Sequence, residues 1–268
     1  MQCAELHSER REEMEEQSMK KTAILVTLTI IAAVAAADPK STTDDGIATD
    51  AGPLVVHPIE HATFVMAWSG KTIVVDPVGG AVAFADFPKA DLILITDVHG
   101  DHLSVETVAA LSGPSTTIVG PAAVAEKFPD ADRARISLLA NGESMEWEGV
   151  VVEALPMYNI TAGREKYHVK GRGNGYVLTV GGKRIYIAGD TEDIPEMRAL
   201  EDIDAAFVCM NLPYTMEVEA AADAVLEFRP KIVYPYHYRG TGGMSDLEAF
   251  KSIVTKDPEI EVRLLEWY

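Results

Sequence analysis

Cysteine is almost absent from this sequence of 268 residues, and the two that occur are Cys3 and Cys209. We expect Cys3 to be removed with an N-terminal leader, which leaves one thiol in the mature chain and excludes an intramolecular disulfide. Cys209 lies in the apolar stretch 205–210. Because free cysteine is among the most buried residue types, we interpret Cys209 as a small core residue and not as a nucleophile.

Basic residues are also in short supply, with 23 Lys and Arg against 42 Asp and Glu and a formal net charge of −19. A field of that sign excludes nucleic acid or an anionic membrane surface as the main partner. Internal repeats and heptad arrays are missing, which excludes solenoid and coiled-coil folds. No Gly-x-Ser-x-Gly motif offers a serine nucleophile. The length suits one α/β domain with a short extension.

Long apolar runs are likewise lacking, because the stretch 22–37 is shorter than the ~20 residues that cross a bilayer comfortably. It follows Met19 and two lysines and ends in three alanines before Asp38, the order of a secretory signal peptide. An uncleaved anchor is the alternative. We expect a periplasmic or secreted protein whose translation starts at Met19. The expected parts are a leader at 1–37, a linker at 38–52 and a single folded domain at 53–268.

Two histidines and two aspartates crowd the end of the apolar segment 92–95. Residues 96–104 read Thr-Asp-Val-His-Gly-Asp-His-Leu-Ser and include Asp97, His99, Asp101 and His102. Imidazole nitrogens and carboxylate oxygens suit zinc and neighbouring first-row metals. Asp and Ser also cap helices, so a purely structural loop is the alternative.

Three further polar residues lie beside predicted strands. Asp190 follows the apolar segment 183–188, and His237 follows the segment 231–235. His168 comes just before a predicted strand at 175–180. Sheet-based folds place their chemistry beyond the C-terminal ends of strands, so these residues are expected near the first cluster.

The order of these motifs resembles that of the metallo-β-lactamase superfamily, namely His-x-His-x-Asp-His, then a His, then Gly-Asp, then a final His. The resemblance spans about residues 53–268. Five further stretches are similar to the branch with ascorbate-6-phosphate lactonase and N-acyl-phosphatidylethanolamine phospholipase D. They are His61-Ala62-Thr63-Phe64, Val75-Asp76-Pro77, Met157-Tyr158-Asn159, Gly189-Asp190-Thr191-Glu192 and Tyr234-Pro235-Tyr236-His237.

The predicted elements agree with that family. Two β-rich runs at 62–76 are separated by Ser69-Gly70, which predicts a hairpin, and Ser104 is expected to cap a helix. Strands between 136 and 188 indicate a second, largely antiparallel sheet, and Ser245 with Glu248 has the spacing of a capping box. Together with the resemblance, this predicts an α/β fold, a metallo-β-lactamase-like αββα sandwich of two mixed sheets with outer helices.

The resemblance implies two divalent metal ions, zinc or alternatively manganese, with seven ligands. One ion would lie on Asp97, His99 and His168 and the second on Asp101, His102 and His237, with Asp190 bridging the two. The family has a histidine where this chain has Asp97. A carboxylate there adds negative charge and favours harder ions such as manganese. The alternative is that Asp97 only orients a histidine N–H and that a single ion binds.

Asp101, Asp190 and His61 are expected to take part directly in catalysis. His61 is either a proton donor near the ions or a packing residue, and Asp76 is expected to brace the metal loop. Three cations flank the ligands and either hold an anionic substrate group or offset the carboxylates; they are Lys170, Arg172 and Arg239. Four aromatic residues are expected at the site or in the core: Tyr158, Tyr214, Tyr236 and Tyr238.

Two ions about 3.5–4 Å apart can activate a shared hydroxide, which favours hydrolysis. The resemblance implies a phosphodiester, lactone or related ester in a small-molecule substrate, which is anionic if the flanking cations bind it. One alternative is an N-acyl phospholipid phosphodiesterase acting at a membrane surface, which requires an exposed apolar lip. Another is a catalytically degenerate metal-binding protein. The oligomeric state is left open by the sequence.

We predict that the mature protein begins at or near Asp38, because the run of alanines before it closes the apolar segment. N-terminal sequencing and intact mass of protein recovered from the periplasm or medium will check this. Recovery of the intact leader there would contradict it.

Overall fold

A computed structural model describes residues 46–268, so the expected leader and the first part of the expected linker lie outside the described residues. The sheet begins earlier than expected. Strand β1 (Gly46–Thr49) falls inside the predicted linker and pairs antiparallel with β2 (Gly52–Glu60). The reason is the side chain of Ile47, which is buried in the core, while the hydroxyl of Thr49 accepts a hydrogen bond from the indole of Trp68.

The first sheet has seven strands in sequence order. After β1 and β2 these are β3 (Thr63–Trp68), β4 (Lys71–Val75), β5 (Leu92–Leu94), β6 (Thr117–Gly120) and β7 (Ile136–Leu138). Pairing is antiparallel from β1 to β4 and parallel from β4 to β7. The expected hairpin at Ser69-Gly70 joins β3 to β4, with both residues at positive φ.

The second sheet also has seven strands, in the order β16-β13-β12-β11-β10-β9-β8. They are β8 (Ser144–Trp147), β9 (Val150–Met157), β10 (Gly173–Val180), β11 (Lys183–Ile187), β12 (Ala205–Cys209), β13 (Ile232–Tyr236) and β16 (Glu261–Val262). Only β8 to β11 pair antiparallel, whereas β11, β12, β13 and β16 are parallel. The sheet is therefore more mixed than expected, because helical crossovers supply its second half.

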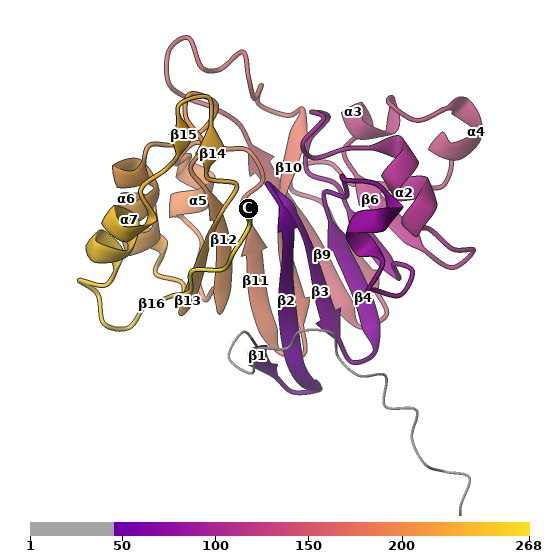
Figure 1. The fold of residues 1–268 in the computed structure, drawn as a ribbon, viewed down its shortest axis with the longest axis horizontal. Coiled ribbons are helices and arrows are strands. Elements are labelled where there is room, and N and C mark those ends of the chain that lie inside the picture. The colour runs from indigo at the N-terminus through magenta and orange to yellow at the C-terminus, as the bar shows by residue number, and fades with distance from the viewer. Residues whose placement is uncertain (1–45) are drawn as a thin grey trace, which may run out of the picture. The chain divides into compact units, whose positions relative to one another are not determined.

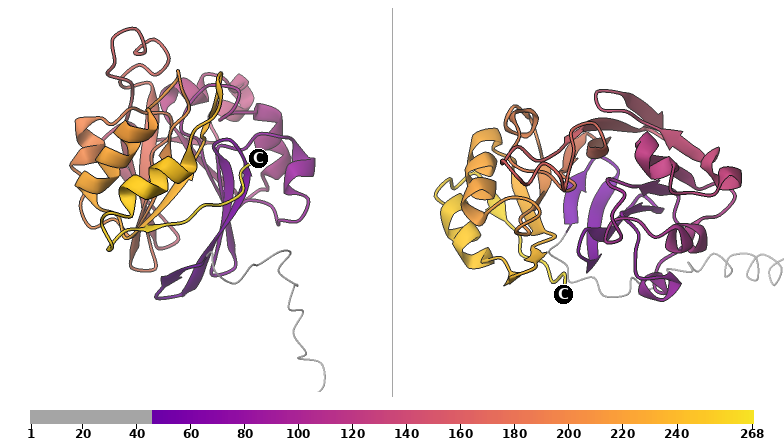
Figure 2. Two further views of the ribbon diagram at one scale, coloured as in Figure 1. Left: turned by 60° about the vertical axis from the view of Figure 1, so that its left-hand side comes forward. Right: turned by 90° about the horizontal axis from the view of Figure 1, so that it is seen from above.

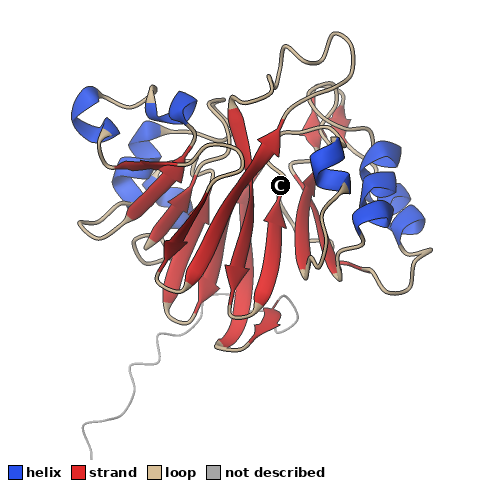
Figure 3. Cartoon of the chain, turned by 180° about the vertical axis from the view of Figure 1, so that it is seen from behind, coloured by secondary structure: helices blue, strands red, loops and turns tan. Residues whose placement is uncertain are grey.

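The two sheets pack face to face with helices outside (Figures 1 and 3). Between them Phe64 stacks on Phe207 with ring centroids 4.4 Å apart. The outer face of the first sheet is covered by η1 (Ala81–Phe84), α2 (Val105–Leu111) and α3 (Ala122–Ala125), and the short helix α4 (Asp130–Arg133) that follows them buries no side chain. The second sheet carries α5 (Pro195–Arg198), α6 (Val218–Phe228) and α7 (Leu247–Val254). This arrangement confirms the predicted sandwich of two mixed sheets with outer helices.

The helix starts are set by short polar side chains. Ser104 caps α2 as expected, accepting a hydrogen bond from the backbone N–H of Thr107. The expected capping box of Ser245 and Glu248 is wrong, because Asp246 is the N-cap of α7 and accepts from the N–H of Ala249. The hydroxyl of Ser245 instead donates to a backbone carbonyl of the loop after β12.

Strands from both sheets end at the same edge of the sandwich. The loops that follow β4, β5, β11 and β13, together with the loop from β9 to β10, come together there (Figures 1 and 2). A small hairpin of β14 (Arg239–Gly240) and β15 (Gly243–Met244) lies beside them. Among residues 46–268, no helix has the length and apolar composition needed to cross a membrane.

Candidate metal centre

Three candidate residues occupy a backbone conformation that side chains other than glycine rarely adopt. His61, Asp76 and His237 have φ of 51°, 46° and 45°. They directly follow the last residues of β2, β4 and β13, respectively. A residue with a Cβ is strained in the left-handed region, and such residues cluster at functional sites. Gly189 also has positive φ, and a Cβ there would lie 2.5 Å from the sulfur of Met157. The edge loops therefore hold their side chains in tightly constrained turns.

The first group consists of Asp97, His99 and His168, whose donor atoms all lie within 4.8 Å of one another. Asp97 Oδ2 is 2.7 Å from His99 Nδ1 and 3.9 Å from His168 Nε2. The two residues of the loop after β5 thus meet a histidine from the loop between β9 and β10. This is the set that the family resemblance implies for one ion.

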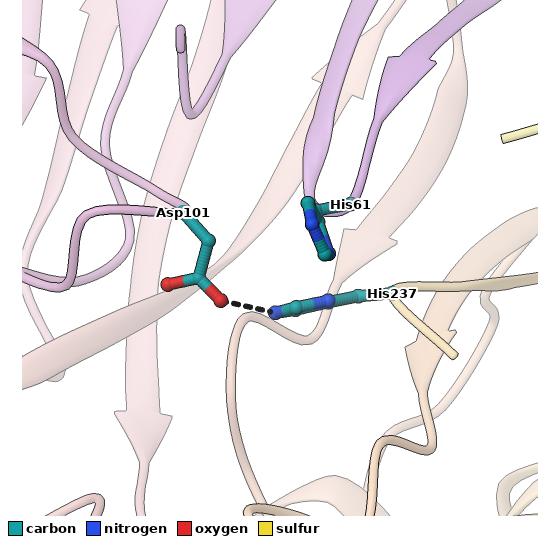
Figure 4. A group of neighbouring side chains, drawn as sticks. All are labelled: His61, Asp101 and His237. Carbon is teal, nitrogen blue, oxygen red and sulfur yellow. Dashed lines mark ion pairs between the residues drawn. The ribbon is translucent and has the colours of Figure 1, made fainter. Parts of the chain in front are cut away.

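The second group contains His102, Asp101, Asp190 and His237. His237 Nε2 is 3.4 Å from both Asp101 Oδ2 and Asp190 Oδ1, and His102 Nε2 is 3.2 Å from Asp190 Oδ2. His61 is near the same place, and Figure 4 shows its ring beside the ion pair of Asp101 and His237. All seven predicted ligands and His61 are therefore brought together at one edge.

Asp190 lies between the two groups. Its Oδ2 is 3.0 Å from His168 Nε2 and 3.2 Å from His102 Nε2, while its Oδ1 faces His237. Two donor atoms on one zinc ion, each about 2.0–2.2 Å from it, are about 3.0–3.5 Å apart. The Asp190 distances match that spacing on both sides, so one carboxylate has the position of a bridge.

The hydrogen bonding of the histidines fits metal binding. His102 Nδ1 is 2.8 Å from the carboxylate of Asp76, and His168 Nδ1 is 3.1 Å from the carbonyl oxygen of Tyr214. Both partners accept, so the proton lies on Nδ1 and the lone pair on Nε2. Among the described residues, His102 Nε2 and Asp190 Oδ1 are buried without any hydrogen-bond partner. Buried polar atoms need a partner, and a metal ion would serve as one here.

Asp76 braces the metal loop, as expected, and is fully buried. Its carboxylate accepts hydrogen bonds from the backbone N–H and the hydroxyl of Thr96, at 2.7 and 2.6 Å, besides the bond from His102. Burial raises the pKa of Asp76, although His102 and Thr96 oppose that rise. Such a partner fixes both the ring orientation and the tautomer of a ligand histidine.

The carboxylates of the second group stay ionised in spite of their surroundings. Burial alone would raise the pKa of Asp190, but the charges of His102, His237 and His168 hold it well below its usual range. The pKa of Asp101 is lowered in the same way, against the effect of burial, by His237 and His102. Both groups are therefore anionic acceptors for positive charge at neutral pH.

Asp97 has a second partner that the sequence did not predict. Arg172 Nε is 3.2 Å from Asp97 Oδ1, and Arg172 Nη2 is 3.0 Å from Asp97 Oδ2. Burial alone would raise the pKa of Asp97, but the bond from His99 and the charges of its neighbours, Arg172 among them, hold it below its usual value. Asp97 is thus a buried anion in a two-point ion pair at the first metal position.

His61 is engaged on both ring nitrogens. Arg239 Nη2 lies 2.6 Å from His61 Nε2, and the hydroxyl of Tyr268 is 3.2 Å from Nδ1. An arginine only donates, so His61 Nε2 accepts, and burial with the charges of His237 and Arg239 lowers the pKa of His61. His61 is therefore neutral here, and its Nε2 carries no proton to donate. The expected role as proton donor requires Arg239 to move away.

The flanking cations each have an acidic partner. Besides the Arg172 pair, Lys170 lies 2.8 Å from Glu196, and Arg239 lies 3.0 Å from Glu60. Arg172 alone offsets a carboxylate of the predicted ligand set, whereas Lys170 and Arg239 pair with acids outside that set.

The four tyrosines and Cys209 divide between the site and the core. Tyr214 has a half-exposed ring and supports His168 through its carbonyl oxygen, whereas Tyr158 and Tyr238 are largely buried. Tyr236 is buried and its hydroxyl accepts a hydrogen bond from the N–H of Gly189. Cys209 is buried as expected, which raises its pKa to about 12 and leaves it an unreactive thiol.

Several supporting residues escaped sequence reasoning. Glu192 is buried, and its carboxylate accepts from the N–H groups of Ile160 and Thr161, which anchors the loop that carries His168. Asn211 places its amide nitrogen 3.3 Å from His237 Nε2. Glu192 had a signal, because it lies two residues after Asp190 in the quoted Gly-Asp-Thr-Glu stretch, but Asn211 had none.

We predict that Asp76→Asn lowers metal affinity about 10–100-fold, because His102 loses the acceptor that fixes its tautomer and orientation. Competition with a chromophoric chelator will measure the affinity. Asp91→Asn is the matched control, since Asp91 accepts from the N–H of Thr72 at the opposite end of β5. Equal affinities of the two variants would contradict the bracing role.

Comparison with known proteins agrees with this geometry. A family model described as the beta-lactamase superfamily domain matches residues 56–237. A UPF0173 metal-dependent hydrolase of Pyrococcus abyssi is 33% identical over 215 residues, covering 75% of this chain and 92% of the relative. A crystal structure of a putative metal-dependent hydrolase from Parabacteroides distasonis is 41% identical, with a TM-score of 0.75 and coverage of 84% of this chain and 98% of that one.

A more distant structure shares the fold alone. Igni18, described as a novel metallo hydrolase from Ignicoccus hospitalis, is 22% identical with a TM-score of 0.66, and the match covers 79% of this chain and 94% of that one. The matched lengths and identities show that this chain belongs to the metallo-β-lactamase superfamily, together with its UPF0173 metal-dependent hydrolase relatives.

Proposed function

We propose that this protein is a hydrolase that binds two divalent ions, zinc or manganese, and cleaves a phosphodiester, lactone or related ester in a small-molecule substrate. The observation that carries the proposal is the position of Asp190, a buried carboxylate within 3.4 Å of His102, His168 and His237. The names of the relatives support the metal-dependent reaction class. The signal-peptide-like order of residues 19–38 supports a periplasmic or secreted location for the enzyme.

When bound, two ions at this spacing would supply an activated water at neutral pH and neutralise negative charge that develops on a substrate oxygen. The chain's own residues do the rest. Asp76 and the carbonyl of Tyr214 keep the protons of His102 and His168 on Nδ1, so that each Nε2 lone pair points at the site. Asp190 remains a carboxylate and holds the two groups at a fixed separation.

The approach of substrate is restricted to one side. The side chains of Asp101 and His99 are each 40% exposed, whereas those of His102, His168 and His237 are at most 1% exposed. A substrate therefore reaches the ions past Asp101 and His99. His61, with 21% of its side chain exposed, lies on the same side as Asp101 (Figure 4). As a neutral imidazole it is suited to accept a proton or orient a substrate hydroxyl once Arg239 releases it.

One observation favours a second candidate, the hydrolysis of a substrate with an apolar chain. Five exposed apolar side chains come from the loops and hairpin at the metal edge, and we call them the apolar rim. They are Ile160, Val169, Leu212, Tyr214 and Met244. Exposed apolar groups gathered beside a site mark apolar ligands or membranes.

Contacts between the loops place the rim at the site. Val169 follows His168 directly, and Tyr214 supports His168 through its carbonyl. The hydroxyl of Tyr214 is 2.8 Å from that of Thr241, whose N–H donates to the carbonyl of Leu212. An N-acyl phospholipid phosphodiesterase requires an apolar lip, so this position of the rim supports an ester or phosphodiester with an acyl chain as the substrate.

Asp190→Ala should abolish hydrolysis and leave a folded domain, because one carboxylate serves both ions. Turnover of generic phosphodiester, lactone and ester substrates is measured at full metal supply, with metal content determined by mass spectrometry. Asp193→Ala is the matched control, because Asp193 pairs with Arg198 away from the ions. If Asp190→Ala keeps more than a few per cent of wild-type turnover, the two-ion assignment is wrong.

Ester substrates with long acyl chains should have a higher kcat/KM than substrates with short acyl chains. Val169→Asp should remove that difference without changing the hydrolysis of the short-chain substrate. Burial of a few methylenes is worth about 1–2 kcal/mol, or roughly tenfold in rate. Initial rates with a chain-length series in neutral micelles will show it. The control is Leu138→Asp, since Leu138 is equally exposed but lies on the edge strand β7. An advantage lost equally in both variants would count against the rim.

A further inference from the structure

The ion pair of Asp97 and Arg172 has the geometry of a fixed unit. Both oxygens of Asp97 accept hydrogen bonds from the guanidinium. Arg172 Nε donates to Oδ1 at 3.2 Å and Nη2 donates to Oδ2 at 3.0 Å, so the two groups meet in two parallel bonds. Arg172 Nη2 also donates to the carbonyl oxygen of Tyr167, at 2.6 Å, so the arginine is itself held in place. The Asp97 side chain is fully buried and that of Arg172 is 24% exposed. A planar fork of donors that matches a carboxylate in two places orients it strongly.

The charges at the first metal position follow from this pair. Where the family has a neutral histidine, Asp97 brings one negative charge, and Arg172 returns one positive charge that is never lost at physiological pH. Asp97 Oδ2, which accepts from Arg172 Nη2, is also the oxygen that faces the two histidines, at 2.7 Å from His99 Nδ1 and 3.9 Å from His168 Nε2. Arg172 Nη2 lies 3.4 Å from His99 Nε2 as well. An oxygen has two lone pairs, so Asp97 Oδ2 can keep its bond from Arg172 while an ion takes the place of the proton between Oδ2 and His99 Nδ1.

We propose that Asp97 and Arg172 act as one neutral ligand unit that replaces the family's first histidine, and that Arg172 is the positioning residue that sets ion affinity and ion preference at this position. The inference rests on the proposed function only in that two ions bind. Without Arg172, Asp97 would be a bare anion beside the ion and would favour harder metals. With Arg172 but without a carboxylate, an uncompensated cation would face the ion.

The test is a four-protein cycle of wild type, Asp97→His, Arg172→Gln and the double variant. Stoichiometry is measured by inductively coupled plasma mass spectrometry, and both dissociation constants for Zn²⁺ and Mn²⁺ by chelator competition. We expect Arg172→Gln to bind one of the two ions about tenfold more tightly, with the larger gain for Mn²⁺. Asp97→His should bind that ion about tenfold more weakly. The double variant should return to near wild-type Zn²⁺ affinity with a stronger preference for zinc.

Arg172→Lys keeps the charge but not the fork, and it should lie closer to wild type than Arg172→Gln does. If lysine behaves like glutamine, charge compensation is not the role of Arg172 and the proposal fails. Arg198→Gln is the matched control, because the Arg198 side chain is 21% exposed and pairs with acids away from the site. It should leave both constants unchanged, and thermal melts monitor folding in every variant.

Other outcomes separate this inference from the proposed function. Equal effects of Arg172→Gln whether residue 97 is Asp or His, or a single ion per chain in all four proteins, would overturn the inference. Equal effects would leave the two-ion hydrolase intact, whereas a single ion per chain would also remove the second ion of the proposed function. The Asp190→Ala variant tests metal-dependent hydrolysis independently of both results. Suppose that Asp190→Ala loses metal binding and that the effects of Asp97→His and Arg172→Gln on affinity simply add in the double variant. The metal-dependent hydrolase would then stand, and only the neutral ligand unit would be wrong.

Discussion

Burial of the Asp190 carboxylate among histidines is the constraint on which this site depends. An anion moved out of water costs several kcal/mol unless opposite charge meets it, and Asp190 is only 2% exposed. His102, His168 and His237 surround it within 3.4 Å, and each comes from a different loop. Without ions, positive charge on these histidines meets the carboxylate, whereas divalent ions between the ligands supply that charge once the imidazoles are neutral. The surrounding structure serves to hold these groups against one another.

Contacts between the two sheets meet this constraint. Asp190 and His237 belong to the second sheet, and His102 belongs to the first, so their relative positions depend on how the sheets pack. The hydroxyl of Tyr176 donates to the carbonyl of Ile95 at 2.8 Å, and the N–H of Asn174 donates to the carbonyl of Thr96 at 2.9 Å. Both bonds tie β10 to the start of the metal loop. The site is therefore fixed by bonds between the sheets as much as by the loops themselves.

Two arginines contact the side chains of the site. Arg172 pairs with Asp97, and Arg239 donates to His61 while its guanidinium stacks 4.4 Å from the ring of Tyr268. The first arginine is anchored by a carbonyl and faces a buried anion, so it is a fixed element of the site. The second is 39% exposed and contacts a neutral ring, so it is the more readily displaced of the two by an incoming substrate.

The sequence by itself determined the hairpin at Ser69-Gly70 and most strands, because turn residues and strand periodicity are local signals. The sandwich and the expected ligand set came from the order of strand-end motifs through the family resemblance. Tertiary structure decided the rest. Arg172 meets Asp97 across 75 residues, and Arg239 meets His61 across 178. The parallel half of the second sheet and the pairing of β1 inside the expected linker were likewise settled by packing. Two residues that pair between the sheets have no fixed spacing in the sequence. Which residues pair therefore depends on how the whole core packs the two sheets together.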